Sequence, residues 1–244
     1  MKIIEIKNVV KRFNGVHAVD QLSIGIEKGQ ITGIIGPNGS GKTTLINLLS
    51  GILKMDSGEI IIDGAKKITR ILPHQVSSYG MARTFQNVRL FEQMTVLDNM
   101  LVVVTEKNVF SSLFKKHTAH DYKIVEEILQ KVGLWEKRDQ LTVNLSYGQR
   151  KLLEIARTLA MKAKVYLFDE PFAGLFPEMR KIVSKIIKEL NQENKTVVLI
   201  EHDMGLIREL CDYIFVIDEG KLLAEGKPES VLERREVIEV YLGE

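Results

Sequence analysis

The sequence has little of what marks secreted, membrane-spanning or nucleic-acid-binding chains. Its 244 residues include one cysteine, Cys211, so an internal disulfide is excluded and a reducing compartment suits the chain. The N-terminal residues lack a signal-peptide core, and apolar runs such as 100–104 are far shorter than a membrane span. The net charge of +2 is too small to argue for nucleic acid. We therefore expect a soluble protein that could still lie against a membrane protein.

A glycine-rich stretch at 36–43 has the clearest chemical meaning. It follows an apolar, β-branched run at 30–35 and precedes an amphipathic run at 44–50, which predicts strand, loop and helix. Backbone N–H groups and the helix dipole attract phosphate there, Lys42 adds a charge for the β- and γ-phosphates, and the Thr43 hydroxyl suits Mg²⁺. A glycine turn that binds nothing is the alternative. The candidate phosphate-binding residues are Gly36, Pro37, Asn38, Gly39, Ser40, Gly41, Lys42, Thr43 and Thr44.

The remaining pattern predicts an α/β fold. An Asn14-Gly15 turn should join two strands at 2–13 and 16–27. Helical spacing at 87–144 indicates a helical insertion and not a second independent domain. We expect one domain, with a nucleotide-binding core and β subdomain at 1–86 and 163–244 and the insertion at 87–162. Further strands are expected at 81–85, 165–169 and 196–200, and further helices at 96–104, 122–132, 150–162, 178–191 and 231–242.

Polar residues follow several of these strands, and in open α/β sheets ligands bind at the carboxyl ends of the strands. Gln86, Asp169-Glu170 and His202 should therefore reach the same edge as the phosphate loop. Asp169 is the expected Mg²⁺ partner, directly or in the second shell. Glu170 could orient and deprotonate an attacking water. For the acidic pair alone, a solvated strand end is the alternative.

Several residues allow a second interpretation. Phe13 could stack on an adenine ring, although a lone aromatic is more often a core residue. Ser146 could be no more than an N-terminal helix cap. Cys211 fits a small buried core position, and His117 and His120 fit loop positions better than metal ligation.

Together these motifs resemble the ATP-binding cassette ATPases, the nucleotide-hydrolysing subunits of ABC transporters. The segment Leu145-Ser-Tyr-Gly-Gln149 shortly before Asp169-Glu170 is the specific element, and the resemblance covers essentially the whole chain. It implies a RecA-like P-loop core with an antiparallel β subdomain and an α-helical subdomain. It also implies that two cassettes pair head to tail, each signature segment covering the partner's ATP. By position, the signature contacts are Ser146, Gly148 and Gln149, Phe13 stacks on adenine, Gln86 senses Mg²⁺ and the membrane partner, and His202 is the switch histidine.

Two positions depart from the commonest family pattern. Tyr147 stands where the signature usually has glycine, so the backbone is less free there. Phe176 stands where many members carry an aspartate that bridges the dimer, which puts that contact in doubt.

Further segments resemble the ATPases of branched-chain amino-acid importers: Met81 to Asn99, the Tyr147 signature, Glu201-His-Asp-Met204 and the ending Tyr241-Leu-Gly-Glu244. That resemblance implies membrane-spanning permease subunits, a second ATPase, an external binding protein and a place at the cytoplasmic membrane face, without nucleic acid. Urea or amide importers and the lipopolysaccharide exporter ATPase share much of the pattern. A non-transport cassette ATPase and a small-molecule phosphotransferase are alternatives from other functional classes.

Four apolar residues near the start of the insertion could either dock the membrane partner or belong to the ordinary core of the subdomain: Val88, Leu90, Phe91 and Met94.

Overall fold

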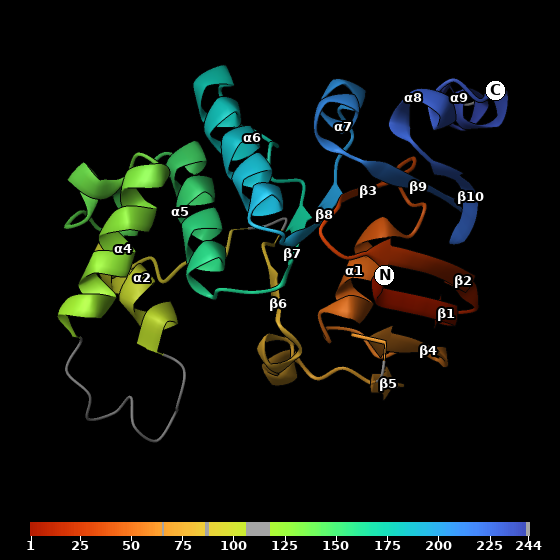
Figure 1. The fold of residues 1–244 in the computed structure, drawn as a ribbon, viewed down its shortest axis with the longest axis horizontal. Helices are drawn as coiled ribbons and strands as arrows, with labels where there is room; N and C mark the ends of the chain where they lie inside the picture. Colours follow the sequence, from red (N-terminus) through yellow and green to blue (C-terminus); the bar gives the residue numbers. More distant parts are fainter. Residues whose placement is uncertain (65, 86–87, 106–117, 243–244) are drawn as a thin grey trace. The chain divides into compact units, whose positions relative to one another are not determined.

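The computed structural model describes residues 1–64, 66–85, 88–105 and 118–242. The chain forms two compact units, both drawn in Figure 1. The first unit comprises Met1–Arg83, Lys164–Glu170 and Ile187–Glu244, and the second comprises Thr84–Ala163 and Pro171–Ile186. No helix among the described residues is long and apolar enough to cross a bilayer.

Two sheets build the first unit. Their strands are β1 (Lys2–Phe13), β2 (Val16–Glu27), β3 (Ile31–Ile35), β4 (Ser57–Ile62), β5 (Lys66–Ile68), β6 (Met81–Arg83), β7 (Val165–Asp169), β8 (Thr196–Ile200), β9 (Tyr213–Asp218) and β10 (Lys221–Gly226). One sheet is antiparallel in the order β2-β1-β4-β5. The other has the order β10-β9-β3-β8-β7-β6, in which every pair is parallel except β9 and β10. The predicted Asn14-Gly15 turn is confirmed, and both residues have the positive φ that a tight hairpin turn requires.

The helix that follows the phosphate loop, α1 (Lys42–Leu49), lies at the centre of the first unit's core. Its apolar face, with Leu45 and Leu49, packs in one buried cluster with residues of both sheets, such as Ile60 and Leu167. Strands β3, β7 and β8 are buried at every residue, as parallel strands covered on both faces must be. The unit's other helices are α7 (Met204–Leu210), α8 (Pro228–Val231) and α9 (Arg235–Leu242).

Three helices pack together in the second unit: α2 (Val96–Thr105), α4 (Ala119–Lys131) and α5 (Tyr147–Ala160). Val125 and Leu129 of α4 and Leu153 of α5 are fully buried there. A further helix, α6 (Pro177–Gln192), begins in the second unit and ends in the first.

Several predicted element boundaries were wrong, among them the start of α4, which lies at Ala119 and not at 122. Helix α5 begins at Tyr147 and not at 150, because Ser146 caps it and Gln149 completes a capping box. Strand β6 ends at Arg83 and not at 85, since the Phe85 N–H donates to a Glu154 side chain instead of a strand carbonyl. The closing helix expected at 231–242 begins only at Arg235, as α9, and Val231 is instead the last residue of the short helix α8.

Candidate functional site: the carboxyl edge of the parallel sheet

Strand register brings the predicted polar residues to one edge. Ile34 of β3 lies opposite Ile200 of β8, and Ile200 lies opposite Asp169 of β7. The three strands therefore end level with one another. The phosphate loop, Glu170 and His202, which follow these ends, emerge side by side as the sequence pattern predicts.

The phosphate loop has a backbone that only glycine can adopt at two positions. At Gly41, φ is +104° and a Cβ would lie 2.2 Å from the carbonyl oxygen of Ala18. At Gly36, φ is +152° and a Cβ would lie 2.0 Å from the carbonyl oxygen of Ile217. The turn after β9 also supports the loop, since the Gly220 N–H donates to the Ser40 carbonyl at 2.9 Å. This turn is a component of the site that the sequence motifs did not indicate.

Lys42, the first residue of α1, is buried with its amino group inside the loop. Its Nζ donates to the carbonyl oxygens of Gly36 at 2.9 Å and of Pro37 at 2.8 Å. Burial lowers the pKa of Lys42, whereas the negative charges of Glu170 and Asp169 act in the opposite direction. The loop lysine and both carboxylates thus share one electrostatic environment.

Glu170 and His202 form a hydrogen-bonded pair at the ends of β7 and β8. The His202 Nε2–H donates to Glu170 Oε1 at 3.0 Å. Glu170 has a φ of 49°, in the left-handed region that non-glycine residues seldom occupy, and its N–H donates to the Ile200 carbonyl at 3.0 Å. A strained backbone of this kind is found at many functional positions.

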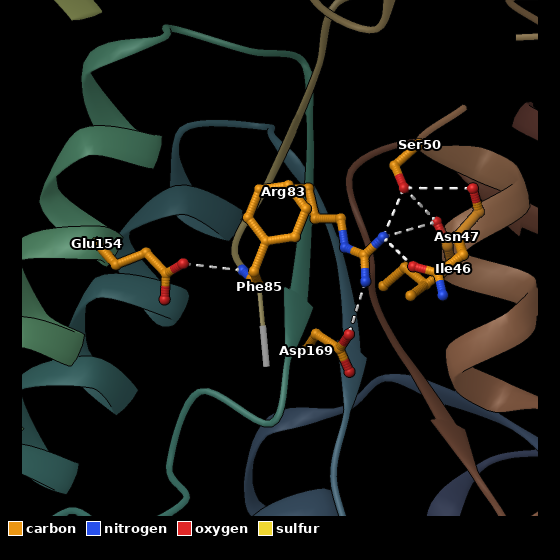
Figure 2. Close-up of polar contacts among 7 residues, drawn as sticks. All are labelled: Ile46, Asn47, Ser50, Arg83, Phe85, Glu154 and Asp169. Atoms are coloured by element: carbon orange, nitrogen blue, oxygen red, sulfur yellow. Dashed lines mark hydrogen bonds and ion pairs between the residues drawn. The ribbon is translucent and has the colours of Figure 1, made fainter. Parts of the chain in front are cut away.

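Asp169 is fully buried and forms an ion pair that the sequence motifs did not indicate. Arg83 of β6 donates from Nη2 to Asp169 Oδ2 at 2.8 Å (Figure 2). The same guanidinium donates from Nη1 to Asn47 Oδ1 at 2.7 Å and to Ser50 Oγ at 2.6 Å. The available signal was an arginine inside a short apolar strand, which requires a buried anion nearby.

The donor set at this edge suits Mg²⁺. The Thr43 hydroxyl, exposed in the first turn of α1, and the Asp169 carboxylate are hard oxygen ligands of the kind that Mg²⁺ prefers. Magnesium also keeps several waters and binds through one or two carboxylates together with substrate phosphates. The side chains present therefore fit a magnesium–nucleotide site.

Phe13 lies at the end of β1 with 44% of its surface exposed, so the alternative interpretation as a core residue is wrong. Lys11 Nζ lies 5.3 Å from the centre of its ring. An exposed aromatic face on the same unit as the phosphate loop is available for a base.

The signature segment lies in the second unit, at the beginning of α5. Ser146 Oγ accepts from the Gln149 N–H at 3.3 Å, and Gln149 Oε1 accepts from the Ser146 N–H at 3.1 Å. Gly148 is buried, and a Cβ there would lie 2.5 Å from Met179 Sδ. The cap interpretation of Ser146 is correct as local structure, and the helix N-terminus it forms is the kind of end that binds anions.

The strand that leads toward Gln86 is held by a buried carboxylate. Gln86 itself lies outside the described residues, as does His117. One residue before Gln86, the Phe85 N–H donates to Glu154 Oε1 of α5 at 3.1 Å (Figure 2). Burial raises the pKa of Glu154, and the Phe85 amide and the charge of Lys151 partly offset that effect.

Comparison with known proteins agrees with this geometry. Residues 19–173 match the family described as ABC transporter, and residues 221–244 match the one described as branched-chain amino acid ATP-binding cassette transporter. The chain belongs to the ATP-binding cassette family. The cassette is 38% identical over 253 residues to the high-affinity branched-chain amino acid transport ATP-binding protein BraF of Pseudomonas aeruginosa, covering 99% of this chain and 98% of that protein.

Two solved structures extend the comparison. The ADP conformation of MJ1267, an ATP-binding cassette of an ABC transporter, is 36% identical, covers 100% of both chains and has a TM-score of 0.86. The dimeric post-hydrolysis state of the cassette MJ0796, bound to ADP and Pi, is 26% identical with a TM-score of 0.81, and covers 92% of this chain and 98% of that one. The predicted family, fold class and ATPase activity are confirmed, and the cassette belongs to the branched-chain amino-acid transport group.

Proposed function

We propose that the cassette hydrolyses ATP to drive import of branched-chain or other hydrophobic amino acids through membrane-spanning permease subunits. The single observation that carries the chemistry is the gathering of Lys42, Asp169, Glu170 and His202 at one sheet edge. The substrate class is supported by full-length similarity to BraF and by the match of residues 221–244. An external binding protein would deliver the amino acid, and the cassette would work at the cytoplasmic face of the membrane.

Each residue has a role that follows from its position. Residues 36–44 hold the phosphates through backbone N–H groups and Lys42, while the exposed face of Phe13 stacks on adenine. Glu170 accepts a proton from the attacking water, and His202 holds the Glu170 carboxylate and contacts the γ-phosphate region. Gln86 would sense Mg²⁺ and the membrane partner, as the family resemblance implies. Thr43 and Asp169 hold Mg²⁺, which supplies charge neutralisation for the β- and γ-phosphates when it is bound.

A second ATPase subunit completes the site. Ser146, Gly148 and Gln149 lie at a helix N-terminus and would cover the nucleotide of the partner cassette, so that each dimer contains two composite sites. The dimeric structure of MJ0796 supports such pairing. Closing on ATP and opening after hydrolysis would then move the membrane subunits.

An apolar surface on the second unit offers a place for the permease. Phe91, Met94, Leu141 and Val143 are between 38% and 47% exposed. Backbone hydrogen bonds hold the two segments side by side, Thr142 N–H to the Met94 carbonyl at 3.1 Å and Val143 N–H to the Glu92 carbonyl at 3.3 Å. An exposed group of this kind is typical of a protein interaction site.

The test is co-purification of the cassette from mildly solubilised membranes of its host, with mass spectrometry of the bound chains. Polytopic subunits together with a second cassette are expected, and uptake of labelled leucine by vesicles containing the complex should then require ATP. Ribosomal or nucleic-acid-processing chains without a membrane subunit would contradict the transport proposal. A permease complex that moves urea but not leucine would contradict only the substrate.

A further inference from the structure

Arg83 is a buried arginine at the edge of the proposed phosphate site. Its side chain is 5% exposed and contacts two elements that both border the phosphate site. On β6 it lies opposite Leu167 of β7, two residues before Asp169, so the side chain reaches the end of β7 along the sheet. Figure 2 shows the guanidinium between α1 and Asp169, with its two terminal nitrogens divided between them.

The α1 side of this contact involves the helix's last turn. Arg83 Nη1 faces three acceptors there: Ser50 Oγ at 2.6 Å, Asn47 Oδ1 at 2.7 Å and the Ile46 carbonyl at 3.3 Å. Ser50 Oγ in turn donates to the Ile46 carbonyl at 2.7 Å. Helix α1 begins at Lys42 and Thr43, which are proposed to bind phosphate and Mg²⁺. The Arg83 guanidinium, held at the other end of α1, is therefore fixed in position relative to the helix that carries these two residues.

The hydrogen bond from Arg83 to Asp169 fixes the orientation of the Asp169 carboxylate. Arg83 Nη2 donates to Asp169 Oδ2 at 2.8 Å, while Oδ1 points away from Arg83 (Figure 2). Asp169 is 0% exposed, and a buried carboxylate is costly unless a cation compensates it. A planar guanidinium can bind two separate acceptors in fixed directions, which the single ammonium of a lysine cannot reproduce.

We propose that Arg83 is a positioning residue that locks the orientation of the Asp169 carboxylate relative to α1, so that Asp169 and Thr43 present their oxygens to one divalent cation. The inference rests on the proposed magnesium–nucleotide site and assigns to Arg83 the orienting role that outer-shell partners play at metal sites. Arg83 does not touch the cation or the phosphates. Its effect is on metal affinity, through Asp169.

The test compares Arg83→Lys and Arg83→Met with wild type and with Lys164→Met. Lys164 is a matched control, a cation of the same unit that pairs with a carboxylate, Asp63, at 3.0 Å on the surface. Mn²⁺ binding to the ATP-loaded protein is measured by electron paramagnetic resonance. Binding of a fluorescent ATP analogue in EDTA and the thermal unfolding temperature are measured in parallel.

We expect Arg83→Lys to keep an unfolding temperature close to that of wild type, because the charge that compensates Asp169 remains. Its Mn²⁺ affinity should nevertheless fall about 10-fold, with metal-free ATP binding within about 2-fold of wild type. Arg83→Met should show at least the same loss of Mn²⁺ affinity if it folds. Lys164→Met should match wild type in all three measurements.

The contrary results separate the possible failures. If Arg83→Lys has both the Mn²⁺ affinity and the unfolding temperature of wild type, Arg83 only compensates the charge of Asp169 and the proposed positioning role is wrong. The same conclusion follows if metal-free and metal-dependent ATP binding weaken equally. If the wild-type cassette shows no Mn²⁺-dependent nucleotide binding, the proposed site itself is contradicted.

Discussion

His202 Nε2 lies 3.0 Å from Glu170 Oε1, so a histidine two residues after β8 holds the glutamate directly after β7 across the edge of the sheet. The contact joins the two side chains that are proposed to act on the attacking water. An ionised carboxylate can only accept hydrogen bonds, so the imidazole Nε2–H is the donor in this pair.

The first prediction concerns this pair. His202→Ala should reduce the ATP turnover rate about 10- to 100-fold, because Glu170 loses the donor that orients it. Nucleotide affinity should change little, since the phosphate loop is intact. His120→Ala, which removes an exposed histidine of α4, is the control and should hydrolyse ATP at the wild-type rate. Equal turnover by His202→Ala and wild type would remove His202 from the reaction.

A second prediction follows from the packing of Tyr147 on Gly174. A Cβ on Gly174, where φ is +71°, would lie 2.7 Å from Tyr147 Cε1. Gly133 has nearly the same φ, +70°, with nothing within 4 Å of its Cβ position. Gly133→Ala should therefore lower the free energy of unfolding by about 1 kcal/mol, because alanine is strained at a positive φ. Gly174→Ala should lower it by about 1 kcal/mol more, because the added methyl group also meets the Tyr147 ring.

Chemical denaturation of the single and double variants measures this excess. In a Tyr147→Ala background, the cost of Gly174→Ala should fall to that of Gly133→Ala, because the ring is gone. If Gly174→Ala costs the same in both backgrounds, the Tyr147 ring does not contribute to that cost and the predicted contact is contradicted. The contact is of interest because it joins the unusual signature residue to the turn that carries Phe176, which is 74% exposed.

The third prediction uses Cys211, which is buried as its helical pattern predicts. Burial raises the pKa of the Cys211 thiol to about 12, with the charges of Asp212 and Glu201 adding to the effect. An unfolded cysteine has a pKa of about 8.5, so the folded state binds more protons than the unfolded state above that pH. Stability must therefore fall as the pH rises from 8.5 toward 12, by about 2 kcal/mol at pH 10.

Urea unfolding at pH 8 and pH 10 tests this sign. Cys211→Ala should be less stable at pH 8 because it loses buried volume, but it should lose about 2 kcal/mol less than wild type between the two pH values. Iodoacetamide at pH 8 should label the thiol only in urea. Rapid labelling of the native protein would contradict the buried, protonated thiol.

Local patterns were sufficient to predict the edge of the sheet. Apolar runs that end at Ile35, Asp169 and Ile200 became level parallel strands, because hydrophobic runs of that length are buried and the polar residues after them must leave the core. The hairpin at Asn14-Gly15 was equally predictable, since few other dipeptides adopt its backbone.

Contacts between distant residues could not be predicted in this way. Arg83 meets Asp169 only because β6 pairs with β7, and nothing in its neighbouring residues encodes that pairing. Glu154 reaches the Phe85 amide across 69 positions of sequence, which shortens the strand expected there. The start of α5 was predicted three residues late because Ser146 was interpreted as a possible cap without Gln149, which completes the capping box and sets the helix boundary.

The most direct test of the account is ATP hydrolysis by Glu170→Gln. This variant keeps the size of the side chain and leaves the phosphate loop intact, but it removes the proton acceptor. It should bind a fluorescent ATP analogue like wild type. It should release phosphate at least 100-fold more slowly and accumulate as an ATP-bound dimer. Phosphate release at the wild-type rate by a purified Glu170→Gln cassette that binds ATP would contradict the account.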